Sequence, residues 1–156
     1  MHIISSMAAI KGKRFIAGIL FIAYLIVLCY LLFFSEEMGR TFSERQYQYN
    51  LVPFKEIWRF LHSWRILGIG VVLINLVGNV LAFVPFGAFL PIFVERSRSF
   101  WRTTLWGFDF SLCVELLQLI TKVGCFDVDD LLLNTIGAAC GYAVYYFFIH
   151  RRRREK

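Results

Sequence analysis

The sequence predicts an all-α membrane protein in which four transmembrane helices form one bundle. The chain has 156 residues, of which 58% are hydrophobic and 18% are charged, a more apolar composition than soluble domains have. Its 17 Phe, 7 Tyr and 4 Trp exclude a disordered chain, because disordered chains are poor in aromatic residues. The apolar residues gather into long uncharged runs, and the length predicts a single domain over residues 1–156.

The lengths of these runs predict the spans. A helix needs about 20 apolar residues to cross the hydrocarbon of a bilayer. Uncharged runs cover residues 15–34, 66–94 and 131–149, and segment 101–121 is apolar apart from three charged side chains. We therefore expect spans at about 14–34, which we predict to be retained rather than cleaved, 66–84, 102–121 and 130–149. The second run is long for one crossing, so it ends near Pro85, or kinks there and continues to 94.

The basic residues predict the orientation, because Lys and Arg in short loops favour the cytoplasmic side. In a four-span chain the N-terminus, the loop after the second span and the C-terminal tail share one side. These three regions hold most of the basic residues: Lys11, Lys13, Arg14, Arg96, Arg98, Arg102, Arg151, Arg152, Arg153, Arg154 and Lys156. We predict that both termini face the cytoplasm. The net charge of +6 is then explained by topology, and no nucleic acid partner is expected.

On the opposite side, segment 35–65 is the only sizeable piece outside the membrane. It combines an apolar stretch at 51–54 with Trp58, Phe60, Leu61 and Trp64. Aromatic side chains favour the headgroup level of a bilayer. The pattern predicts a helix that lies in the outer interface between the first two spans.

Three of the spans carry polar and small residues at helical spacing on one face. These residues are Asn75, Gly78, Asn79 and Ala82 in the second span, Ser111, Glu115, Gln118 and Lys122 in the third, and Asp127, Asp130, Asn134, Gly137 and Gly141 in the fourth. Ionisable side chains are costly in hydrocarbon and usually face the bundle interior. The three faces are therefore expected to meet in one polar cluster in the outer half of the membrane.

Structural roles compete with ligand binding for these residues. Asn75 and Asn79 are also typical of interhelical packing, and Asp127, Asp129 and Asp130 of a solvated loop and a helix start. Asp109 lies off the Glu115 face, and it either takes part in a packing contact or pairs with an Arg on the cytoplasmic side. Gly78, Gly87, Gly137 and Gly141 are the predicted helix-packing residues, the last two as a G-x-x-x-G pattern that permits close approach.

No motif indicates a metal or a cofactor. The four Cys form no C-x-x-C pair, and the three His are far apart in sequence. Nucleotide-binding and hydrolase motifs are absent as well. We predict no metal and no cofactor, and we leave enzymatic activity open while favouring its absence.

Four motifs in order resemble the VanZ-like family of small bacterial membrane proteins. They are N-L-V-P-F at 50–54, N-L-V-G-N at 75–79 running through F-V-P-F-G at 83–87, E-L-L-Q at 115–118, and D-V-D-D at 127–130 followed by Asn134, Gly137 and Gly141. Together they cover residues 50–141. Many relatives carry an Arg before the last motif, whereas this chain offers only Lys122.

The resemblance implies a multi-pass protein of the bacterial cytoplasmic membrane and an association with resistance to teicoplanin. Our first hypothesis is that an outward-facing polar groove binds an envelope lipid, a lipid-linked precursor or a lipoglycopeptide antibiotic. Glu115, Gln118, Asp127, Asp130, Asn134, Asn75 and Asn79 would make the polar contacts. The alternatives are an intramembrane enzyme acting on a lipid-linked substrate through Glu115, and a structural or assembly subunit of a membrane complex. The oligomeric state is left open.

Overall fold

The computed structural model describes residues 2–34 and 47–154, and it has four long helices that are apolar enough to cross a membrane. They are α1 (His2–Phe34), α4 (Ile69–Phe93), α5 (Phe100–Thr121) and α6 (Val128–Arg154). The predicted all-α membrane fold with four spans is therefore confirmed. The first part of the predicted outer segment, 35–46, and the side chains of the basic tail, 150–156, lie outside the described residues.

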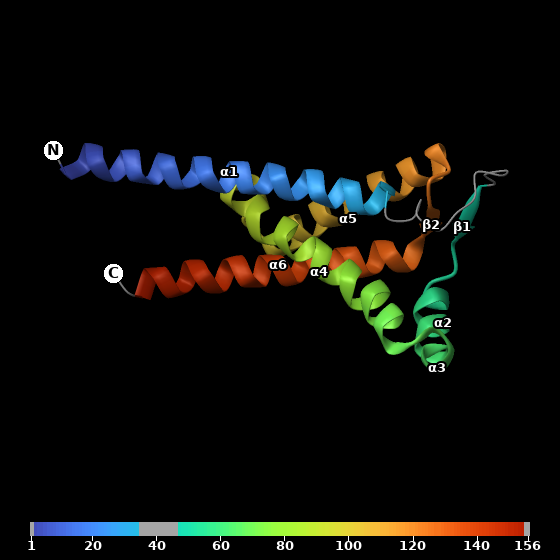
Figure 1. The fold of residues 1–156 in the computed structure, drawn as a ribbon. Coiled ribbons are helices and arrows are strands. Elements are labelled where there is room, and N and C mark those ends of the chain that lie inside the picture. The colour runs from blue at the N-terminus through green and yellow to red at the C-terminus, as the bar shows by residue number, and fades with distance from the viewer. Residues whose placement is uncertain (1, 35–46, 155–156) are drawn as a thin grey trace.

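The four helices run between two ends of an elongated molecule. The N-terminus of α1 and the C-terminus of α6 lie at the same end (Figure 1). The opposite end, called the distal end below, holds the short elements β1 (Gln48–Asn50), α2 (Lys55–His62), α3 (Trp64–Leu67) and β2 (Cys125–Asp127). A 3-10 turn, η2 (Glu95–Ser97), joins α4 to α5 at the other end.

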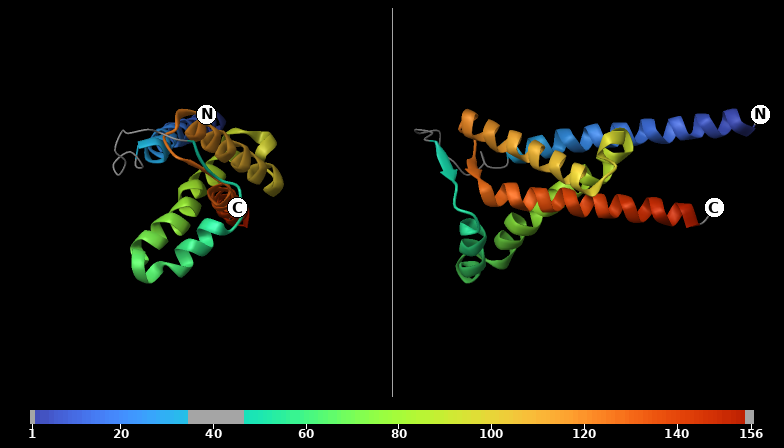
Figure 2. Two further views of the ribbon diagram at one scale, coloured as in Figure 1. Left: turned by 90° about the vertical axis from the view of Figure 1, so that its right-hand side faces the viewer. Right: turned by 180° about the vertical axis from the view of Figure 1, so that it is seen from behind.

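Helix α6 is the centre of the bundle. It makes its most extensive contacts with α4 and the next most extensive with α5, and an end-on view places it between them (Figure 2, left). Aromatic rings fill the space beside it: Phe86 of α4 stacks on Phe110 of α5 with ring centroids 5.0 Å apart. Helix α1 packs mainly on α4, where Phe21 contacts Phe86. Between Arg14 and Phe33 most of the α1 side chains are exposed, as expected of an outer helix in lipid.

Close approach of α4 and α6 depends on glycine. A Cβ atom added to Gly87 would lie 1.9 Å from the carbonyl oxygen of Ala138, and one on Gly141 would lie 2.0 Å from that of Val84. Gly137 faces the α4 backbone in the same way. Gly78, the fourth predicted packing glycine, has nothing within 4 Å of such an atom, so it takes no part in this close approach.

The second span takes the longer of the two forms that the sequence left open. Helix α4 begins at Ile69 and does not end near 84: it continues through Pro85 and Pro91 to Phe93. Transmembrane helices tolerate proline, and α1 is joined to α4 near Pro85 by the Tyr24 hydroxyl, which donates to the Ala82 carbonyl at 2.6 Å. Its 25 residues measure about 37 Å, which exceeds a bilayer core of about 30 Å. Consistent with that excess, α4 crosses α6 obliquely (Figure 1).

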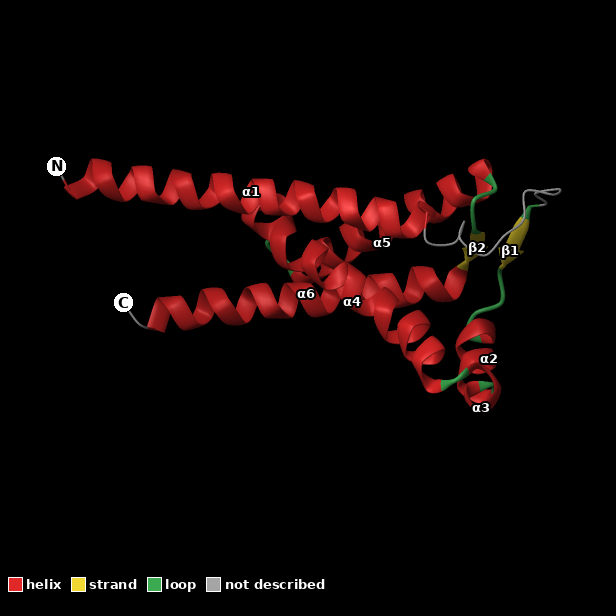
Figure 3. Ribbon diagram, in the orientation of Figure 1, coloured by secondary structure: helices red, strands yellow, loops and turns green. Residues whose placement is uncertain are grey.

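The distal end contains a feature that the all-α prediction omitted. Strands β1 and β2 pair in parallel, with Gln48 opposite Cys125 and Asn50 opposite Asp127, and they stand out as the only strands among the described residues (Figure 3). Each has three residues, too few to show the alternation by which a strand is recognised in a sequence. The pairing fixes the chain between α1 and α4 to the start of α6.

Candidate functional site

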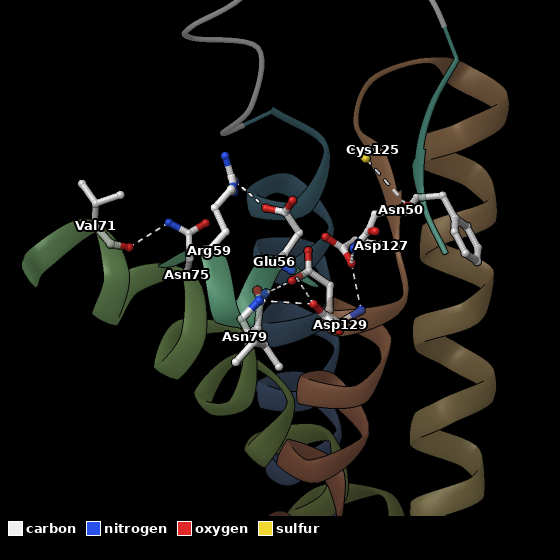
Figure 4. Close-up of polar contacts among 12 residues, drawn as sticks. Asn50, Glu56, Arg59, Val71, Asn75, Asn79, Cys125, Asp127 and Asp129 are labelled. Carbon is white, nitrogen blue, oxygen red and sulfur yellow. Dashed lines mark hydrogen bonds and ion pairs between the residues drawn. The ribbon is translucent and has the colours of Figure 1, made fainter. Parts of the chain in front are cut away.

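Four buried polar side chains from distant parts of the chain meet at the distal end, and Figure 4 labels three of them, Asn50, Asp127 and Asp129. They form what we call the distal cluster: Asn50 of β1, Glu115 of α5, Asp127 of β2 and Asp129 of α6. The segment that they hold, residues 47–67 with β1, α2 and α3, is called the distal arm. It corresponds to the described part of the predicted outer segment, and the predicted helix there is present as α2 followed by α3.

Asp127 joins three elements. Its Oδ1 accepts a hydrogen bond from the Asn50 side chain at 3.0 Å and another from the Asp129 backbone N–H at 2.8 Å. Its own N–H donates to Oε2 of Glu115 at 2.9 Å. Asp127 therefore connects the arm, the start of α6 and the distal end of α5.

The Asp129 side chain holds the distal arm by accepting hydrogen bonds from the backbone of the arm. Its carboxylate accepts from the N–H groups of Phe54 at 2.5 Å, Glu56 at 2.8 Å and Ile57 at 3.2 Å. These donors surround the first turn of α2, where N–H groups lack partners within the helix. Phe54 has the left-handed φ of +66°, a costly conformation for a residue with a side chain, and the bond to Asp129 helps to maintain it. Asp129 thus acts as a helix cap supplied from 73 residues away.

Burial changes the acidity of one member of the distal cluster, Asp127. The pKa of Asp127 is raised above its ordinary value of 3.8, chiefly because burial penalises the charged form. The hydrogen bonds from Asp129 and Asn50 act in the opposite direction. Asp127 precedes the first residue of α6 and lies outside the spans. Its protonation can therefore respond to the medium on that side.

The other predicted site residues form separate contacts rather than one site. Asn79 of α4 donates to Oδ1 of Asp130 at 2.5 Å, and both residues are half-buried. Asn75 instead donates to the Val71 carbonyl of its own helix at 2.8 Å, and Figure 4 shows it apart from Asp127 and Asp129. The Asn79–Asp130 pair is thus a second polar position between α4 and α6.

Two further contacts join the long helices. Asn134 donates to the Ser111 hydroxyl at 2.9 Å, and its own side-chain oxygen is buried without a partner in the described structure. Gln118 donates to the Leu32 carbonyl of α1 at 2.7 Å. These contacts tie α5 to α6 and to α1. Lys122, the last member of the predicted α5 face, caps that helix and places its ammonium 4.4 Å from the centre of the Tyr47 ring.

The distal arm presents an apolar and basic surface. Several of its large side chains are more than half exposed: Tyr47, Tyr49, Leu51, Val52, Phe54, Trp58, Leu61 and Ile66. Arg59 lies 4.8 Å from the Phe60 ring and pairs with Glu56, and Arg65 lies 5.3 Å from the Trp64 ring. Aromatic and basic groups in this mixture are typical of a surface that contacts lipid headgroups.

The chemistry of the distal cluster suits positioning. Its carboxylate oxygens accept hydrogen bonds from the chain's own N–H groups and from Asn50. Across residues 2–34 and 47–154, no three His, Cys, Asp or Glu side chains are grouped as metal ligands would be. These bonds hold the arm in place, whereas the arm's aromatic side chains are exposed and the Asn79–Asp130 pair is half-buried.

Sequence reasoning gave Asn50, Asp129 and Ser111 no place among the site residues. Asn50 and Asp129 stand within the two motifs at 50–54 and 127–130, and Ser111 lies on the Glu115 face. Asn50 reaches Asp127 only because β1 lies beside β2. No local pattern in the sequence predicts that strand pair. The repeated Asp at 127, 129 and 130 was the available signal for Asp129.

The sequence is similar to a known protein family and to one of its characterised members. The family described as VanZ/LLP1 has a model that matches residues 21–149. Protein VanZ of Enterococcus faecium is 27% identical over 136 residues, which cover 86% of this chain and 75% of that protein. No solved structure matches. The family match runs from α1 to α6 and includes the distal cluster and the arm.

Proposed function

The chain belongs to the VanZ/LLP1 family, and from this premise and the distal arm we propose that it modulates susceptibility to teicoplanin-type glycopeptides. It does so by binding an amphiphilic ligand at the outer surface of the bacterial cytoplasmic membrane. The ligand is an envelope lipid, a lipid-linked envelope precursor or the lipoglycopeptide itself. All three combine a polar headgroup with a hydrocarbon chain.

The observation that carries this proposal is the exposed aromatic surface of an arm that is rigidly held. Trp58 is 64% exposed and Phe54 is 65% exposed, yet the backbone between them is fixed by Asp129. A preorganised surface loses less entropy on binding than a mobile one. The arm therefore suits recognition of a ligand that lies in the interface with its chain in the hydrocarbon.

The position of the arm relative to the cell follows from the basic residues. The described Arg14, Arg96 and Arg98 lie at the end of the bundle that holds the termini, where Arg14 and Arg98 donate to the carbonyls that end α4. The positive-inside rule assigns that end to the cytoplasm. The distal arm then faces the cell exterior, where glycopeptides and late envelope precursors are found.

We assign recognition of the polar headgroup of the ligand to the polar residues of α4 and α6 beside the distal arm. Asn79 and Asp130 are half-buried, and Asn75 lies one helical turn further along α4. Glu56 and Arg59 extend from α2 above this region (Figure 4). Glu115 and Asp127 act indirectly, by holding the arm, as does Gln118 by joining α5 to α1.

The test is the antibiotic susceptibility of a strain that expresses the protein. Wild-type protein is expected to raise the inhibitory concentration of teicoplanin and to leave that of vancomycin unchanged. Trp58→Ala, Asp130→Asn and Glu115→Gln are expected to lose this protection at matched membrane abundance. Trp101→Ala is the matched control, since Trp101 is also highly exposed, at 78%, but lies on α5 at the opposite end.

Binding is measured separately with purified protein and teicoplanin. Loss of a central aromatic contact costs about 2 kcal/mol, so Trp58→Ala should weaken binding about 30-fold. Protection from teicoplanin without measurable binding of teicoplanin would indicate that the ligand is an envelope lipid or a lipid-linked precursor. Full protection by the double variant Glu115→Gln, Asp130→Asn would contradict a role for the polar residues and favour a structural subunit.

A further inference from the structure

A carboxyl group stands exposed in the middle of a membrane span. Asp109 is an exposed residue of α5, nine residues from Phe100 and twelve from Thr121, the ends of that helix. At 1.5 Å per residue it lies about 14 Å and 18 Å from these ends. It is therefore near the bilayer centre, on the side of α5 that turns away from α6.

No described residue pairs with Asp109. The sequence offered an Arg on the cytoplasmic side as one partner, but Arg102 donates to the Arg96 carbonyl and Arg98 pairs with Glu95. Packing inside the bundle, the other expectation, is excluded by its exposure. Ionisable residues at this depth are costly in contact with lipid and almost always face protein or water. Something outside this chain should therefore cover Asp109.

The exposed residues around Asp109 are spaced as a helix-pairing seam. They follow alternating steps of four and three along α5, the spacing with which two helices interlock over several turns. The seam consists of Arg102, Trp106, Asp109, Cys113, Leu116 and Ile120, all of them exposed. Its large apolar members could fill the holes of a facing helix, and Asp109 lies at its centre.

We propose that the face covering Asp109 is the same seam of a second copy of this chain. The two copies are related by a two-fold axis normal to the membrane, which brings identical residues together at identical depth. Asp109 thus faces Asp109 of the other copy. Two carboxyl groups can hydrogen-bond to each other as a pair, so a second Asp109 satisfies the first without a cation. A partner helix of another protein would need a polar group at the same depth and a matching seam, both of which a second copy supplies.

Cys113 makes the dimer directly testable. It lies one turn from Asp109 in the seam and is a free exposed thiol, so the two-fold arrangement places it opposite Cys113 of the second copy. Cys29 of α1 and Cys140 of α6 are also free and exposed, but they belong to other faces. They serve as matched controls.

The experiment is oxidative cross-linking with copper–phenanthroline in native membranes. Three variants each keep one thiol, Cys113, Cys29 or Cys140, and replace the other cysteines by Ala. The Cys113 variant is expected to give a covalent dimer in much higher yield than the two controls. Equal yields from all three, or no dimer from the Cys113 variant, would overturn the proposal.

Substitution of Asp109 in the Cys113 variant tests its role in the pairing. Asp109→Leu should lower the cross-linked fraction about three- to tenfold, the range expected for one lost interhelical hydrogen bond. Asp109→Asn should preserve it, because a carboxamide also donates and accepts. An unchanged cross-linked yield with Asp109→Leu would contradict the carboxyl pair. A lower yield with Asp109→Asn would contradict it as well, because that is the result expected if a cation on the partner covers Asp109. Asp109→Leu makes the span more apolar, so reduced insertion does not explain a lower yield, and membrane abundance is measured alongside.

Discussion

Asp129 shows how one buried side chain can hold an entire surface element. Its carboxylate accepts three backbone N–H groups of the arm and is 1% exposed. Removal of a helix-capping side chain costs about 1–2 kcal/mol. We expect Asp129→Ala to destabilise the arm by that amount or more, because buried donors would lose their partner. The measurement is hydrogen exchange of residues 54–57 in purified protein.

Asp129→Asn is the graded control for this prediction. The carboxamide keeps one acceptor oxygen but turns an NH2 group toward the remaining backbone donors. Exchange should therefore be intermediate between wild type and Asp129→Ala. Equal protection in all three proteins would mean that the strand pair alone holds the arm.

The raised pKa of Asp127 predicts that the stability of the protein depends on pH. Its pKa is raised above 3.8 in the folded protein, so the folded state binds the proton more tightly than the unfolded state. The resulting stabilisation is complete below pH 3.8 and is lost as pH rises through the raised pKa. We expect wild type to lose stability over that interval relative to Asp127→Asn, which retains the acceptor for Asn50 and does not ionise. Thermal unfolding in detergent at a series of pH values measures the difference, and parallel curves for the two proteins would contradict it.

The residues of the site were only partly accessible to sequence reasoning. Helical spacing correctly grouped Ser111, Glu115 and Gln118, since all three are buried. It could not reveal that Asp127 precedes the helix and lies in a strand, because β1 and β2 are defined by a contact between segments 77 residues apart. Spacing also placed Asn75 with Asn79, but α4 diverges from α6 at that point.

At the scale of elements, the crossing of α4 and α6 is set by glycine. Any side chain at Gly87 or Gly141 would collide with a carbonyl of the facing helix. Gly87→Ala should destabilise the protein by about 1–3 kcal/mol, the usual cost of overpacking. Gly78→Ala in the same helix meets nothing and should be neutral or stabilising by up to about 1 kcal/mol, because alanine favours helix. Thermal unfolding of the two variants in one detergent tests the contrast, and equal melting temperatures would show that the helices can separate freely.

The elements themselves were largely predictable because their signals are long. Three long uncharged runs and one apolar segment with three charged side chains predicted the four spans, and the aromatic pattern of the arm predicted α2. The end of the second span stayed open between 84 and 94, because a proline can end a helix or be accommodated inside a membrane helix, and the structure shows the longer helix. The strand pair was not predicted because each strand has only three residues, too few to show the alternation of a strand.

For the whole molecule, orientation is the property on which the proposed function depends. Both termini share one end, and the basic residues of the η2 loop lie there too, which predicts a distal arm outside the cell. In a chain whose four cysteines are replaced by Ala, a single cysteine at Leu61 of the arm or at Arg96 of η2 reports the side. Both positions are exposed. A membrane-impermeant maleimide applied to intact cells should label Leu61→Cys several-fold more than Arg96→Cys, and permeabilisation should equalise them. The reverse pattern would place the arm in the cytoplasm, where no glycopeptide could reach it, and would exclude recognition of the antibiotic by this surface.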